Sequence, residues 1–85
     1  MTVLDIRNIT TEEGYIYYRK NYSGVAIVEL QTIEEIPLKF LIETSPLGDK
    51  TVEITLLKDI HYPMLPVIKE LKKFILEKSN SGTLP

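Results

Sequence analysis

Tyrosines near the start of the chain are the residues whose types and spacing most suggest a chemical role. Tyr15, Tyr17 and Arg19 are spaced two apart, so in an extended strand they project from one face of a sheet. Lys39, on a later predicted strand, adds a second cation to that side. Aromatic rings beside cations can stack the bases of single-stranded nucleic acid and hold its phosphates. These four residues define the predicted aromatic–basic face.

The same face is predicted to carry acidic side chains as well, namely Glu29, Glu43 and Glu53. Carboxylates at these positions would repel the phosphates of a nucleic acid. Tyrosine is also a favoured strand residue, because its ring covers apolar surface and packs across strands. We therefore favour structural packing or a protein contact for the aromatic–basic face, with nucleic-acid binding as the alternative.

Residues for catalysis or metal binding are scarce in this sequence. There is one histidine, there is no cysteine, and the glycines are isolated, so no phosphate-binding loop is present. The acidic pairs at 12–13 and 34–35 fall in predicted loops, where solvent removes the desolvation that would raise a carboxyl pKa. We predict no enzyme, no catalytic residue, no cofactor and no metal site.

An amphipathic helix is predicted over 67–78, where apolar residues recur every three or four positions. Leu65 and Leu76 lie at one side of this apolar stripe and widen it. Two interpretations stay open: the leucines form the contact of a homodimer, or the sheet curls around the helix and buries them.

Strands are predicted at 2–7, 15–20, 25–33, 38–44 and 51–57, where apolar and polar residues alternate. The segments between them are predicted as a loop or single helical turn at 8–14, a hairpin turn at 21–24, a break at 34–37 and a turn at 45–50. These connections are too short for a crossover helix, so neighbouring strands must pair antiparallel.

The strand and helix patterns each have one apolar face, and these faces must pack together. The predicted core consists of Val28, Leu30, Phe40, Ile42, Val52, Ile54, Leu71, Phe74 and Ile75. The fold class is therefore α+β: an antiparallel meander of four or five strands, packed on one face by a single C-terminal helix. We expect one small domain over 1–85, with 79–85 as a flexible tail.

Composition supports a single globular domain. The chain has 85 residues, of which 44% are hydrophobic and 26% charged, and the net charge of −2 does not favour a nucleic acid or an anionic membrane as partner. The absence of cysteine favours a reducing compartment, and no leader or membrane-spanning run is apparent. We predict a cytoplasmic protein with no membrane partner.

The predicted order of strands followed by a helix, over roughly residues 14–78, resembles that of the PUR-type and PC4-like single-stranded nucleic-acid-binding domains. The resemblance implies dimerisation and single-stranded nucleic-acid binding, and because it lies in the order of elements it assigns no residue a role. Our preferred prediction is a small non-enzymatic binding or assembly module that acts through protein–protein contacts, as a homodimer or with another protein. Single-stranded nucleic-acid binding is the alternative.

Overall fold

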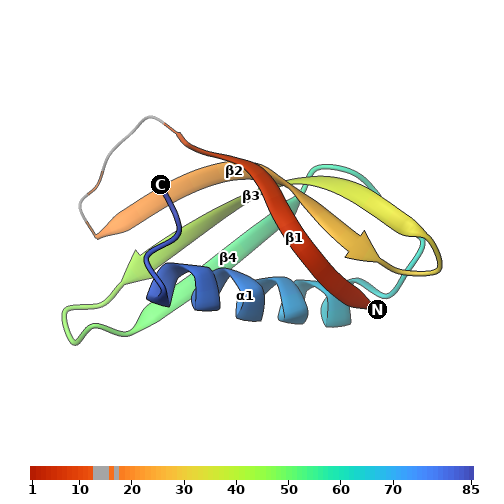
Figure 1. Ribbon diagram of the computed structural model, residues 1–85. Helices are drawn as coiled ribbons and strands as arrows, with labels where there is room; N and C mark the ends of the chain where they lie inside the picture. Colours follow the sequence, from red (N-terminus) through yellow and green to blue (C-terminus); the bar gives the residue numbers. More distant parts are fainter. Residues whose placement is uncertain (13–15, 17) are drawn as a thin grey trace.

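The computed structural model describes residues 1–12, 16 and 18–85 (Figure 1). Within these ranges the elements are β1 (Thr2–Thr11), β2 (Arg19–Glu29), β3 (Ile33–Thr44), β4 (Lys50–Leu56) and α1 (Met64–Asn80). The strands form one antiparallel sheet in the order β1-β2-β3-β4, so each strand pairs with its neighbour in the sequence. The predicted α+β meander with a C-terminal helix is confirmed, with four strands.

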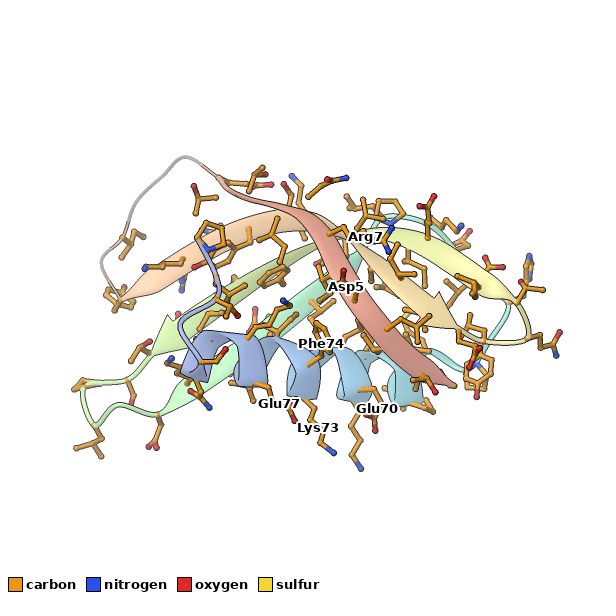
Figure 2. All side chains as sticks on the ribbon, in the orientation of Figure 1. Asp5, Arg7, Glu70, Lys73, Phe74 and Glu77 are labelled. Carbon is orange, nitrogen blue, oxygen red and sulfur yellow. The ribbon has the colours of Figure 1, made fainter. Side chains whose placement is uncertain are left out.

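The sheet curves around the helix, because α1 makes close contacts with both edge strands, β1 and β4 (Figure 1). We call the sheet face that points towards α1 the inner face and the opposite one the outer face. The helix buries Val67, Leu71 and Ile75, which are spaced four apart and line one side of it. Figure 2 shows Phe74 on the side of α1 towards β1, with Lys73 and Glu77 on the side away from it.

The core lies between the inner face and α1. Its buried members are Ile6, Tyr22, Ala26, Val28, Ile36, Leu38, Phe40, Ile42, Val52, Val67, Leu71 and Ile75. Of the residues predicted for it, Leu30, Ile54 and Phe74 are only partly buried and pack against this cluster. The others that we predicted are buried within it.

The helix begins after Pro63, which occupies the N-cap position without a capping side chain. Pro66 lies in the first turn, where a proline costs no backbone hydrogen bond. Asp59, which we considered as a cap, is exposed and lies before this start. Gly82 follows the C-cap with φ 73°, a left-handed conformation that suits glycine and ends the helix.

The predicted hairpin turn at 21–24 is wrong, because these residues lie inside β2. Tyr22 is 3% exposed, and its ring stacks on that of Phe40 with 5.0 Å between centroids. Gly24 indicated a turn, but its role is to leave space: a Cβ there would lie 3.1 Å from the Arg7 carbonyl oxygen and 3.3 Å from Ile6 Cγ2. A glycine inside a strand often marks this kind of close approach.

The predicted break at 34–37 is also wrong, since these residues belong to β3 and pair with 25–28 of β2. Ile36 is fully buried. Pro37 is tolerated because its carbonyl accepts a hydrogen bond from Leu57 N (2.8 Å), which shows that its backbone polar groups face the β4 side. Its missing N–H therefore removes no hydrogen bond to β2.

The first strand is longer than predicted, because part of the expected loop at 8–14 continues it as far as Thr11. Register shifts between Val3 and Asp5 and between Arg7 and Thr10 mark two irregularities of the bulge type. Asn8 lies in the second one with φ 56°, a conformation that asparagine adopts more readily than most residues. The extra residues blurred the alternation that identifies a strand.

The segment after the helix returns to the sheet. Leu84 packs against the core cluster, and the Tyr22 hydroxyl donates a hydrogen bond to the Pro85 carbonyl oxygen (3.2 Å). The predicted flexibility of 79–85 concerns motion and stays a prediction. Across the described ranges, no helix combines the length and apolar character needed to cross a membrane.

Candidate interaction surfaces

Two members of the predicted aromatic–basic face, Tyr15 and Tyr17, lie outside the described residues. The other two, Arg19 and Lys39, both project from the outer face, since the strand positions that alternate with them, such as Ile42, are buried on the inner face. The structure thus confirms that the two cations share one side of the sheet.

Each of these cations is held by a carboxylate. Arg19 donates through Nε (2.9 Å) and Nη2 (2.8 Å) to Oε2 of Glu43, the residue directly opposite on β3. The hydrogen bond to Glu43 and the charge of that carboxylate raise the pKa of Arg19. Lys39 Nζ lies 3.4 Å from Oε1 of Glu12. A phosphate would have to displace these partners, so the outer face is a poor surface for nucleic acid.

We therefore expect no binding of single-stranded DNA or RNA at micromolar protein in near-physiological salt. Fluorescence anisotropy of labelled oligo-dT and oligo-rU, read across a salt series, is the measurement. If three cations did meet phosphates, the affinity would fall with salt with a logarithmic slope of about 2, at roughly 0.7 per phosphate. Binding with that slope, weakened about 5- to 150-fold by Tyr17→Ala through the loss of one stacked base, would establish the nucleic-acid alternative.

The two leucines at the helix flank have different environments. Leu76 is partly buried and packs against the core cluster, as expected if the sheet curls around the helix. Leu65, in the first turn of α1, is 83% exposed. They do not form one apolar surface, which leaves Leu65 as the only exposed member of the predicted pair.

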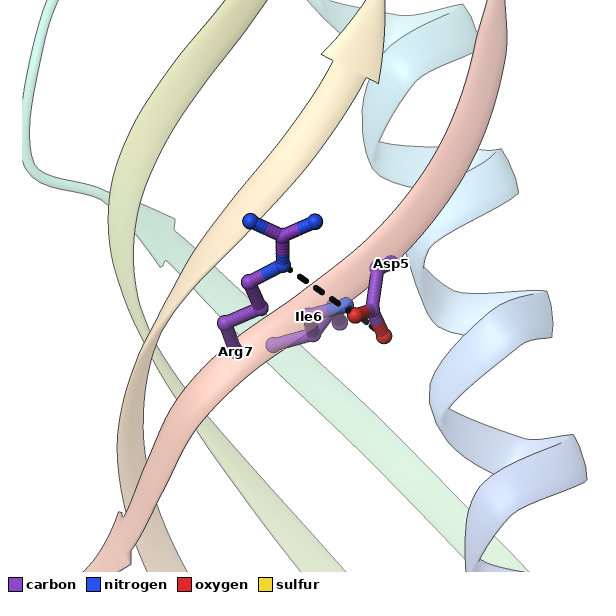
Figure 3. Close-up of polar contacts among 3 residues, drawn as sticks. All are labelled: Asp5, Ile6 and Arg7. Atoms are coloured by element: carbon purple, nitrogen blue, oxygen red, sulfur yellow. Dashed lines mark hydrogen bonds and ion pairs between the residues drawn. The ribbon is translucent and has the colours of Figure 1, made fainter.

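A shallow depression on the sheet beside Ile27 was not predicted from the sequence. Apolar side chains of Leu4, Ile27 and Ile33 line it together with charged groups. Figure 3 shows two of these charges: Arg7 Nε lies 3.4 Å from Asp5 Oδ2, while Asp5 Oδ1 accepts a hydrogen bond from Ile6 N (2.9 Å). The bulge before Asp5 shifts the alternation here, which is why the pattern of β1 gave no signal for this surface.

The depression also holds Lys58, whose ammonium donates to the Glu35 carbonyl oxygen (3.0 Å) and lies 3.6 Å from Glu34 Oε1. Its cations thus have acceptors within the chain. We assign no ligand to it.

The free edge of the sheet at β4 is the most regular unpaired feature of the described residues. The Leu57 to Pro37 hydrogen bond shows that the odd-numbered positions of this ladder face β3. The even-numbered residues Val52, Ile54 and Leu56 therefore direct their N–H and C=O groups away from β3. No backbone group of the described chain is bonded to them on that side.

Sequence comparison places the chain in a family. Neither the curated proteins nor the solved structures contain a match to it. A family model described as the BB_0187 family matches residues 1–80, which is nearly the whole chain, and this description names no activity. The protein therefore belongs to the BB_0187 family.

Proposed function

We propose that this protein is a small, non-enzymatic assembly module that forms a homodimer by pairing β4 with β4 of a second copy. The observation that carries the proposal is the open side of β4, where three consecutive outward positions have no backbone partner in the described chain. Unpaired strand edges accept another strand through main-chain hydrogen bonds.

The geometry of the two edges favours β4 over β1. The pairing of β1 is shifted twice, and Asn8 interrupts its extended backbone. Bulges of this kind twist an edge and hinder the addition of a further strand. The β3–β4 register runs without a shift from Leu38 opposite Leu56 to Thr44 opposite Lys50. A regular strand of this length can present a continuous ladder.

A second copy is favoured as partner because β4 is complementary to itself. An antiparallel pairing about a two-fold axis can place Ile54 opposite Ile54 of the other copy and Val52 opposite its Leu56. This register continues the apolar inner face across the junction. On the outer face it places Glu53 opposite Thr55, whereas a register centred one residue earlier would place two Glu53 carboxylates opposite each other.

The size of the chain supports association. A domain of 85 residues buries a limited share of its surface when it folds alone. Ile54 and Leu56 of β4 are only partly buried against the core. Pairing of β4 would cover both, which adds apolar burial to the main-chain hydrogen bonds.

A charge exchange at Thr55 tests this register. Thr55 is exposed and lies opposite Lys39 within the chain, so Thr55→Glu should leave the fold intact. In the dimer the new carboxylate would oppose Glu53 twice, which should raise the dimer Kd about 2- to 30-fold. Thr55→Lys should lower the Kd over a similar range by forming two opposite-charge pairs. Light scattering across a dilution series measures both changes.

Leu65→Glu is the matched control, since it adds the same charge at an exposed position outside β4. It should leave the dimer Kd unchanged. A mass of one chain at high micromolar concentration would refute the homodimer. A dimer that ignores both Thr55 variants and dissociates with Leu65→Glu would instead place the interface on the helix flank.

The proposal includes the absence of catalysis and a cytoplasmic location. Its support is the residue inventory, which has one histidine and no cysteine. A membrane partner forms no part of it.

A further inference from the structure

A pocket of about 250 Å³ lies on the inner face, where the last turn of α1 and the segment after it meet the ends of β2, β3 and β4. Its lining includes the ammonium-bearing side chains of Lys20 and Lys50, the hydroxyl-bearing Thr44 and Ser79, and the apolar Ile42 and Leu84. The pocket therefore combines cations and hydroxyl donors with apolar surface.

Strand register places both lysines on the inner face. Lys20 lies opposite Ile42, which in turn lies opposite the buried Val52, so Lys20 shares their side of the sheet. Lys50 lies opposite Thr44 and two residues before Val52, on the same side. The two lysines come from β2 and β4, and β3 lies between them.

The charge balance of these lysines differs from that of the other cations on the sheet and its loops. Those others each lie within ion-pair distance of a carboxylate: Arg7, Arg19, Lys39 and Lys58. Over the described part of the chain, neither Lys20 nor Lys50 has such a partner, and no carboxylate side chain lines the pocket. Lys50 Nζ instead donates to Ser79 Oγ (2.8 Å), which fixes its ammonium at the pocket wall.

The end of α1 does not cancel this positive charge. The last carbonyls of a helix carry partial negative charge when they are unpaired. Here the carbonyls of Glu77 and Ser79 accept hydrogen bonds from Ser81 N (3.0 Å) and Gly82 N (3.2 Å). Thr83 N donates to the Lys78 carbonyl (3.1 Å). The backbone thus satisfies these acceptors itself.

The remaining walls are apolar and held in place. Tyr22 lies under the pocket with its ring stacked on Phe40, and its hydroxyl donates to the Pro85 carbonyl. This hydrogen bond keeps the chain around Leu84 against the sheet. An anion alone would contact only part of such a lining, whereas an anion with an apolar group would also cover Ile42 and Leu84.

We propose that this pocket binds a small organic anion, with its charged group between Lys20 and Lys50 and its apolar group against Ile42 and Leu84. This inference goes beyond the assembly role and does not depend on it, because every lining residue comes from one chain and none belongs to the outward positions of β4.

Isothermal titration calorimetry with phenyl phosphate and with inorganic phosphate tests the proposal. Phenyl phosphate should bind saturably, once per chain, and more tightly than inorganic phosphate. The double variant Lys20→Gln with Lys50→Gln should weaken this binding by at least about tenfold, the scale of one lost charge-assisted hydrogen bond. Both lysines lie outside the core, so the fold should persist, as circular dichroism will show.

The matched control is Lys69→Gln with Lys72→Gln, which removes the same charge from exposed positions on the helix. It should leave phenyl phosphate binding unchanged, as should Thr55→Glu. Three results would overturn the proposal: no saturable binding to wild type, equal weakening in both lysine double variants, or equal affinity for inorganic phosphate. Loss of binding in Thr55→Glu would contradict a site formed by one chain.

Discussion

Tyr22→Ala should lower the free energy of unfolding by about 3–5 kcal/mol, the range for removing a large aromatic side chain from a core. Tyr22 is 3% exposed, belongs to the core cluster and stacks on Phe40. Its removal leaves a cavity between the sheet and the segment that follows α1. Urea denaturation followed by circular dichroism measures the change. A loss below about 1 kcal/mol would instead fit the exposed turn position predicted from the sequence.

Tyr22→Phe separates the ring from the hydroxyl. It keeps the stack on Phe40 and removes only the hydrogen bond to the Pro85 carbonyl, so it should cost about 0.5–1.5 kcal/mol. A cost as large as that of Tyr22→Ala would show that the hydroxyl, and not the ring, holds this part of the core.

Burial also gives Tyr22 a signature at alkaline pH. Burial raises the pKa of its phenol above the ordinary value, because the buried site disfavours the phenolate. The folded state therefore holds the proton more tightly than the unfolded state. The corresponding stability is complete below the ordinary tyrosine pKa of about 10 and falls as the pH rises above it. Tyr22→Phe should remove this contribution to the alkaline loss of stability.

Ile36→Ala should lower the free energy of unfolding by about 2–5 kcal/mol, because Ile36 is fully buried at the centre of the core. Ile33→Ala is the matched control, since Ile33 lies on the same strand and is 63% exposed. It should change stability by no more than about 0.5 kcal/mol. Chemical denaturation of both variants under one set of conditions gives the comparison. Equal small effects would mean that the segment containing Ile36 does not pack as part of β3.

The strands at 38–44 and 51–57 and the helix at 67–78 could be predicted from the sequence because local pattern and burial agree there. In each, apolar residues recur at the period of the element, and polar or turn residues mark its ends. Gly24 and Pro37 misled the prediction, since their local preference is for turns and breaks. In the sheet, Gly24 makes room for β1, and Pro37 has its backbone groups on the β4 side. Both reasons depend on a neighbouring strand, which a pattern of single residues does not contain.

The candidate sites divide in the same way. The shared face of Arg19 and Lys39 follows from alternation along strands, and so could be predicted. The pocket between Lys20 and Lys50 requires the register of three strands and the path of the chain after α1. A turn at 21–24 would have placed Lys20 at the end of a hairpin. The open side of β4 likewise requires the order of strands in the sheet.

The irregular course of β1 bears on how many copies can assemble. A chain with two regular edges could add further chains at both, and the product would be an open-ended fibre with its strands across the long axis. The shifts around Leu4 and Asn8 leave β4 as the one regular edge of the described sheet. Pairing of β4 with its copy occupies that edge in both chains, so growth stops at two. Straightening of β1, and not a change in β4, is the lesion by which this protein would become a polymer.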